Sequence, residues 1–137
     1  MRYLLDTNII AEPTKPQPNP TVATQLAQHY SEVAIASVSW HELWFGTERL
    51  SISRRRENLE QYLTELVDIN RPILPYTTVA ARWFATERSR LVSRGLTPSY
   101  PDGQIVSIAS TNNLILVTRN TSDFIYFDGL QLENWFE

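Results

Sequence analysis

The sequence contains no cysteine. Disulfide bonds and thiolate metal ligands are therefore excluded, and the protein fits a reducing cytoplasm, where we expect it to reside. Long apolar runs are also missing, since no stretch approaches the ~20 apolar residues that a membrane helix requires. The first residues, MRYLLDTNII, become charged too early for a signal peptide. We therefore expect no membrane attachment.

Lysine is nearly absent, occurring only as Lys15, and the net charge is −3 from 15 acidic and 12 basic residues. Nucleic-acid-binding proteins are more often basic, so the overall charge counts against such a partner. The other basic residues are arginines, whose guanidinium pairs bidentately with phosphate. They form two clusters, each of which equally fits a solvated helix face: Arg49, Arg54, Arg55, Arg56 and Arg82, Arg88, Arg90, Arg94.

Short apolar segments predict the strands of the domain. The clearest are 3–5, 33–36 and 114–117, and weaker candidates lie at 73–74 and 130–132. Helical spacing of apolar residues predicts helices between them, at 21–28, 39–50, 57–67, 77–94 and 101–112, with Gly95 ending the fourth. The proline-rich segment Pro13–Pro20 (PTKPQPNP) is predicted to be an ordered extended loop.

Continuously apolar strands separated by helices are typical of a parallel sheet that is covered on both faces. We therefore predict one domain spanning residues 1–137, an α/β fold of three layers with a mostly parallel sheet of four to five strands flanked by helices. In such folds the ligand binds beyond the carboxyl ends of the strands. The residues that follow each strand are therefore the candidates for function.

Two acidic residues follow the first two strands. Asp6 comes directly after the first, where an Asx-turn or a helix cap is the alternative explanation. Glu42 lies in Ser39-Trp40-His41-Glu42, which also matches the S-x-x-E capping box. The two roles of Glu42 exclude each other, because a carboxylate on a metal cannot also reach back to the Ser39 amide.

Two further acids stand later in the chain. Asp102 follows Pro101 at a predicted helix start, where the helix dipole favours an acid for structural reasons alone. It also shares a face with Ile105 and Val106, at the edge of a buried stripe where an unpaired carboxylate is costly. No lysine is near, so a cation is a natural partner. Asp123 follows the strand at 114–117, and a lone loop aspartate is more often structural.

All four acids can converge at one end of the sheet. Oxygen ligands without cysteine, and with only His29 and His41 to supply nitrogen, suit Mg²⁺ or Mn²⁺ better than Zn²⁺. A site of this kind activates water and stabilises an in-line displacement at phosphorus.

Four segments, LLDTNII, SWHELWFG, PDGQIVSIA and LVTRNTSDF, resemble in content and order the acidic motifs of the PIN-domain family. The ending GLQLENW resembles the tails of VapC toxins, and PTKPQPNP resembles their FitB-like branch. The resemblance runs from Met1 to about Trp135, although residues 51–100 match only in pattern.

This resemblance implies an endoribonuclease dependent on Mg²⁺ or Mn²⁺ that hydrolyses RNA phosphodiester bonds as the toxin of a type II toxin–antitoxin pair. It implies a small inhibitory antitoxin of the VapB type and a homodimer. Large aromatic residues favour such an interface, although simple burial in the core explains them equally well: Trp40, Trp44, Trp83 and Phe84. The implied catalytic and metal-binding acids, with their supporting polar residues, are Asp6, Glu42, Asp102 and Asp123, with Thr7, Thr118 and Asn120. The fourth acid varies most in the family, and Asp128 is a weaker substitute for Asp123.

Two other functions fit parts of the pattern. Receiver domains and aspartate-nucleophile phosphatases also place an acid after the first strand, but receivers need a late lysine and such phosphatases need a second aspartate where this chain has Asn8. A non-catalytic PIN-like scaffold that binds only a partner is the second alternative. The retention of all four acids argues against it.

Overall fold

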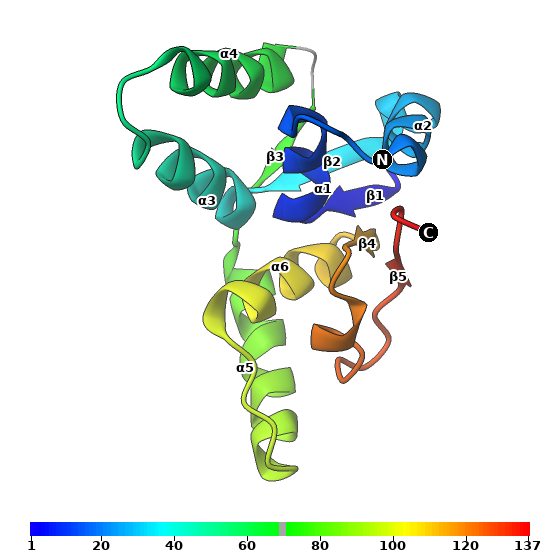
Figure 1. The fold of residues 1–137 in the computed structure, drawn as a ribbon. Coiled ribbons are helices and arrows are strands. Elements are labelled where there is room, and N and C mark those ends of the chain that lie inside the picture. The colour runs from blue at the N-terminus through cyan, green and yellow to red at the C-terminus, as the bar shows by residue number, and fades with distance from the viewer. Residues whose placement is uncertain (69–70) are drawn as a thin grey trace.

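The computed structural model describes residues 1–68 and 71–137 (Figure 1). Five strands form one sheet in the order β3-β2-β1-β4-β5, and each neighbouring pair is parallel. The strands are β1 (Tyr3–Leu5), β2 (Val33–Ala36), β3 (Ile73–Leu74), β4 (Ile115–Val117) and β5 (Leu132–Glu133). The predicted parallel α/β sheet is confirmed.

The connections are helical. The α-helices are α1 (Thr7–Ala11), α2 (Pro20–Gln28), α3 (Ser37–Glu48), α4 (Arg54–Asp68), α5 (Thr78–Ser93) and α6 (Tyr100–Thr111). Three short 3₁₀ turns, η1 (Glu12–Thr14), η2 (Tyr30–Glu32) and η3 (Thr121–Asp123), complete them. Among the described residues, no helix is both long enough and apolar enough to cross a membrane.

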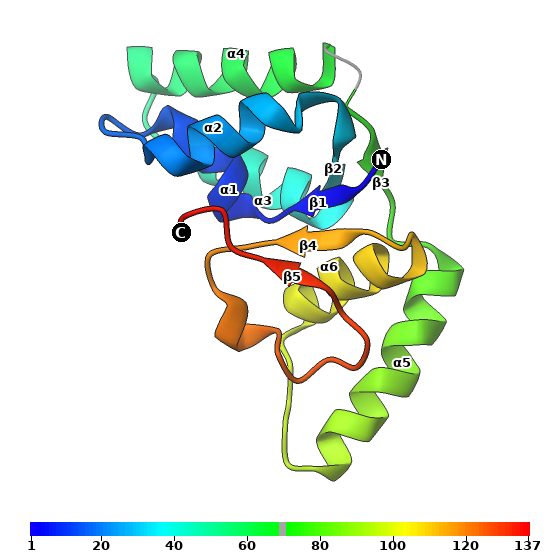
Figure 2. The same cartoon turned by 90° about the vertical axis from the view of Figure 1, so that its right-hand side faces the viewer.

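Strand residues alternate between two cores because successive side chains of a strand point to opposite faces. Leu4, Ala34 and Leu116 belong to the core that includes residues of α5 and α6. Leu5, Ile35 and Val117 belong to the core that includes residues of α1 and α2. Figure 2 shows α5 and α6 together on one side of the molecule, apart from α2 and α4. The three predicted layers are therefore present.

The structure corrects several predicted boundaries. The segment Pro13–Pro20 is not extended throughout, because Pro13 lies in η1 and Pro20 opens α2, leaving only residues 15–19 irregular. Proline tolerates the first turn of a helix, where its missing N–H has no partner to lose. Helix α1 was not predicted, since five residues are too few to show a helical period. The last strand lies at Leu132–Glu133 instead of 130–132.

Helix α5 ends in a tight turn at the predicted glycine. Gly95 has φ +78°, and the amides of Gly95 and Leu96 donate to the carbonyls of Val92 (3.0 Å) and Leu91 (2.9 Å). This pair of bonds is the Schellman motif, which ends a helix with a left-handed residue. Helices α5 and α6 then come so close that a Cβ on Gly103 would overlap the Phe84 ring. This close approach brings the start of α6 to the carboxyl edge of the sheet.

Candidate active site

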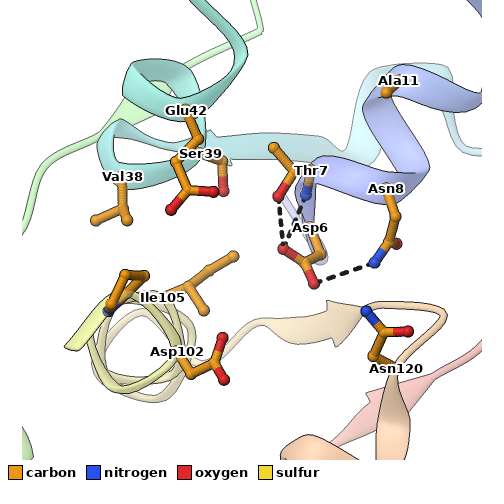
Figure 3. A pocket seen from close by; sticks show the side chains of 11 residues that line it. Asp6, Thr7, Asn8, Ala11, Val38, Ser39, Glu42, Asp102, Ile105 and Asn120 are labelled. Carbon is orange, nitrogen blue, oxygen red and sulfur yellow. Dashed lines mark hydrogen bonds between the residues drawn. The ribbon is translucent and has the colours of Figure 1, made fainter. Parts of the chain in front are cut away.

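The carboxyl ends of β1, β2 and β4 meet at one cavity of about 420 Å³. Figure 3 shows the carboxylates of Asp6, Glu42 and Asp102 turned toward this space from three separate elements. Asp6 follows β1, Glu42 lies on α3 after β2, and Asp102 lies in the first turn of α6. Three acids that are far apart in sequence thus line one cavity, as the sequence predicted.

Asp6 is the most firmly held of the three. Its Oδ1 accepts hydrogen bonds from the backbone N–H of Thr7 (2.8 Å) and from the Thr7 hydroxyl (3.1 Å). Its Oδ2 accepts from the hydroxyl of Thr118 (2.8 Å), while the Nδ2 of Asn8 lies at 3.5 Å, the limit of hydrogen bonding. Asp6 also caps α1, so the structural alternative raised for it is true alongside its place in the cavity.

Glu42 does not form the capping box that its sequence context suggested. Helix α3 begins at Ser37 with Ala36 as N-cap, so Ser39 is already inside the helix and buried. A capping box needs its serine at the N-cap. Glu42 lies more than one turn after the start of α3 and is exposed at the cavity. Its side chain forms no hydrogen bond or ion pair with the described residues. The competing explanation for this acid is therefore removed.

Asp102 is part-buried and sits among the other acids. The hydroxyl of Ser99, the N-cap of α6, accepts a hydrogen bond from the Asp102 N–H at 3.2 Å. Burial is the main cause that raises the pKa of Asp102, and the charges of Asp6, Asp123 and Glu42 raise it further, against a lowering by the Ser99 hydroxyl. A carboxyl group whose pKa rises among like charges is a candidate partner for a cation.

Asp123 lies beside this cavity and not in its lining. It is exposed in η3 and lines an adjoining cavity that shares Asp102. The substitute considered for it, Asp128, lines a third cavity with Trp83 and Leu130 and is therefore outside the acid cluster. Asp123 remains the better fourth acid of the two, although it is set apart from the other three.

The predicted supporting residues are near Asp6. Thr7 and Asn120 line the cavity, and Thr118 is completely buried behind it, with its hydroxyl accepting from the Asn120 N–H at 3.1 Å. The sequence reasoning missed Asn8, which lines the cavity and whose Oδ1 accepts from the Arg119 N–H (3.1 Å). Its position two residues after an acid at a strand end was the signal that could have identified it.

The donors suit a hard cation, but they are not closed around one. Within residues 1–68 and 71–137, no three His, Asp or Glu side chains are gathered closely enough to hold a metal ion by themselves. Oxygen is the only donor atom that the lining acids, Thr7 and Ser39 offer. Mg²⁺ commonly binds through one or two carboxylates and keeps several waters, so an open, oxygen-lined cavity fits it.

Comparison with known proteins agrees with this geometry. The family model described as PIN domain matches residues 3–130. The chain belongs to the PIN domain family. Toxin FitB of Neisseria gonorrhoeae is 32% identical over 137 residues, covering 96% of this chain and 97% of that protein. The tRNA(fMet)-specific endonuclease VapC of Shigella flexneri is 28% identical over 135 residues, covering 98% of each.

The fold agrees as well. The crystal structure of FitAcB from Neisseria gonorrhoeae superposes with a TM-score of 0.90 and 29% identity, covering 98% of this chain and 99% of that one. The resemblance to the PIN-domain family and to its FitB and VapC members is confirmed. Membership in this family removes the receiver-domain and aspartate-phosphatase alternatives.

The structure also places the aromatic and arginine side chains that the sequence singled out. Phe84 is 4% exposed and belongs to the core, so it adds no surface for a homodimer, and Trp83 stacks on the buried Phe127. Among the clustered arginines, Arg56 pairs with Glu60 (2.8 Å) and Arg90 pairs with Glu87, so each guanidinium already has a carboxylate partner. These two half-buried arginines therefore belong to structural ion pairs.

Proposed function

We propose that this PIN-domain protein is an endoribonuclease dependent on Mg²⁺ or Mn²⁺, and that it is the toxin of a type II toxin–antitoxin pair in the cytoplasm. The observation that carries the proposal is the convergence of Asp6, Glu42 and Asp102 on one open cavity at the carboxyl edge of the sheet. Because these acids come from three elements, capping of any one helix does not explain their meeting.

In this proposal Asp6, Glu42 and Asp102 hold the cation, and Asp123 contributes from the neighbouring cavity. A bound Mg²⁺ or Mn²⁺ supplies activation of water and offsets charge on the scissile phosphate. The chain itself fixes the orientation of Asp6 through Thr7 and Thr118, so that this carboxylate needs little reorganisation when substrate arrives. The exposed Asn120 side chain lines the cavity, where its amide can donate to a phosphate oxygen.

The test is cleavage of a mixed RNA pool by purified protein without a bound antitoxin, in Mn²⁺ and in chelator. We expect cleavage only with the metal, and we expect Asp6→Asn to abolish it. Asp128→Asn is the matched control, since it changes an exposed aspartate outside the acid cluster and should retain activity. Transfer RNA is the first defined substrate to try, because one relative is named as a tRNA(fMet)-specific endonuclease.

The non-catalytic scaffold remains a second candidate because the described acids are not closed around a metal position. It predicts that folded wild-type protein leaves all RNA intact in millimolar Mn²⁺ and that Asp6→Asn changes nothing. Metal-dependent cleavage that is lost in Asp6→Asn would exclude this candidate.

We further propose that the partner is a small antitoxin of the VapB type and that the active species is a homodimer. An arginine of the antitoxin can replace the cation, because a guanidinium pairs bidentately with carboxylates. Titration of Mn²⁺ into free and antitoxin-bound protein tests this mode, with tight uptake expected only by the free protein. Equal uptake by both would mean that the antitoxin leaves the acids open. Light scattering at tens of micromolar tests the dimer, and a monomer there would refute it.

A further inference from the structure

A second cavity adjoins the acid cluster formed by Asp6, Glu42 and Asp102. Its volume is also about 420 Å³, and its lining comes from the end of α5, the α5–α6 connection, the start of α6 and the segment that follows β4. Figure 2 shows the α5–α6 connection and that segment on the same side of the molecule. Asp102 lines both cavities, so the second lies directly beside the first. Apolar residues, Leu91, Leu96, Pro98 and Phe127, make up much of its lining.

Both walls of this cavity are held in place by defined contacts. The Schellman turn at Gly95 fixes Leu96 and directs the chain through Pro98 to the start of α6. On the opposite wall, Arg90 Nη2 donates to the carbonyl oxygen of Tyr126 at 2.8 Å. The buried carboxylate of Glu87 accepts from the N–H of Asp128 at 2.9 Å and pairs with Arg90. The cavity is therefore formed before a ligand enters.

The lining selects a neutral ligand with flat apolar faces and a polar edge. Leu91 and Phe127 are buried and offer an apolar floor, whereas Tyr126 is 51% exposed and offers an aromatic side chain at the mouth. Hydroxyl groups of Thr97, Ser99 and Ser122 can both donate and accept hydrogen bonds. The carboxylates of Asp102 and Asp123 repel a phosphate that arrives without a cation. A nucleobase has the required combination of properties.

We propose that this second cavity binds the base of the nucleotide next to the scissile phosphate. The inference rests on the proposed ribonuclease function, because the shared Asp102 places the base beside the bond that would be cut. A base in a duplex has its faces stacked and its edge engaged, so only an unpaired or extruded base can enter a walled cavity.

The experiment measures binding of short RNAs to the Asp6→Asn protein in Mn²⁺, which leaves the RNA uncut. In a set of single-stranded oligoribonucleotides, each position in turn lacks its base but keeps its ribose and phosphate. Fluorescence anisotropy gives the Kd of each RNA. Stacking on an aromatic side chain predicts that one abasic position, adjacent to the bond cut by the wild type, weakens binding by about 5- to 100-fold.

Three second-site variants assign that effect to the cavity. Tyr126→Ala should weaken binding of the intact RNA and remove most of the difference in Kd between intact and abasic RNA. Tyr126→Phe keeps the aromatic ring and should retain that difference. Ile125→Ala is the matched control, since Ile125 is 61% exposed, is adjacent in sequence and does not line the cavity. All of these positions are on the surface, and thermal melting verifies that each variant is folded.

The outcomes separate the two proposals. If the wild type cuts RNA but no abasic position changes Kd, the base pocket is refuted while the ribonuclease function stands, and the cavity is left to an apolar side chain of a protein partner. A second outcome is that the wild type cuts no RNA while one abasic position weakens binding only in proteins that keep an aromatic ring at position 126. That result would support the base pocket and refute the ribonuclease function. An abasic effect of equal size in Tyr126→Ala also refutes the pocket.

Discussion

The hydroxyl of Thr118 should be the main support of the acid cluster from behind. It is completely buried, donates to Asp6 Oδ2 at 2.8 Å and accepts from the Asn120 N–H at 3.1 Å. Thr118→Val keeps the branched side chain but removes the hydroxyl. Asn120 is exposed, so water can accept the hydrogen bond from its N–H in the variant. The loss in unfolding free energy therefore comes mainly from the bond to the Asp6 carboxylate.

A hydrogen bond to an ionised group contributes about 1.5–3 kcal/mol to the free energy of unfolding. For a domain of this size, that loss lowers the melting temperature by roughly 6–12 °C. The assay is urea unfolding of wild type, Thr118→Val and Thr118→Ser in chelator. Serine keeps the hydroxyl and should lose only the packing of one methyl group, about 1 kcal/mol.

A double-mutant cycle with Asp6→Ala decides whether the bond itself is responsible. We expect Thr118→Val to destabilise the wild type by at least about 1.5 kcal/mol more than it destabilises Asp6→Ala. If both backgrounds lose the same free energy, Thr118 acts by packing alone, and the account of a preorganised Asp6 is refuted.

Three further predictions concern stability. Because the pKa of Asp102 is raised, its charge disfavours folding as pH rises through the folded pKa, so Asp102→Asn should melt at a higher temperature than wild type in chelator at pH 7.5. Millimolar Mn²⁺ should stabilise the wild type and so reduce this difference in melting temperature. A mutant that melts at a lower temperature would show that Asp102 has a structural role. The pKa of Glu87 is lowered mainly by Arg90, so wild type should lose stability as pH falls below about 4.5, and the slope of unfolding free energy against pH should be shallower in Glu87→Gln. Gly103→Ala should lower the free energy of unfolding in urea by about 1–3 kcal/mol, because its Cβ meets the Phe84 ring. The control Gly46→Ala meets nothing within 4 Å and should stabilise α3 by about 0.5–1 kcal/mol. Equal changes in the two variants would contradict the close packing of α5 and α6.

The sheet and the acids that follow its strands were predictable because buried strands consist of consecutive apolar residues, which are visible in the sequence. Strands β1, β2 and β4 are buried on both faces, so they appear as uninterrupted apolar segments. The carboxyl ends of parallel strands share one edge, and that rule brings Asp6 and Glu42 together. Asp102 follows no strand and joins them from the first turn of α6. Asp123 also follows a strand, but its side chain is oriented by η3, a 3₁₀ turn of three residues. So short a turn has no sequence periodicity from which that orientation could be predicted.

Features that depend on one tertiary contact were not predictable. The capping box considered as the alternative role of Glu42 is absent because α3 starts directly from β2 at Ser37. The S-x-x-E pattern does not show where the preceding strand ends. Phe84 was assigned to a surface because it is large and aromatic. Its burial depends on Gly103, nineteen residues later, which lets α6 approach closely enough to cover it.

The capping role of Asp6 and its proposed metal role do not exclude each other, because they use different oxygen atoms. Oδ1 accepts both bonds from Thr7 and so holds the start of α1, a five-residue helix too short to form alone. Oδ2 accepts one strong bond from Thr118, and its other contact, to Asn8, is at the limit of bonding. A cation can displace that weak contact and leave the cap intact. Asparagine caps helices as well as aspartate does, so Asp6→Asn removes the charge and keeps the cap, while an amide nitrogen replaces the oxygen that accepts from Thr118. Asp6→Ala removes cap, charge and the bond to Thr118 together, and its inactivity would not separate function from stability.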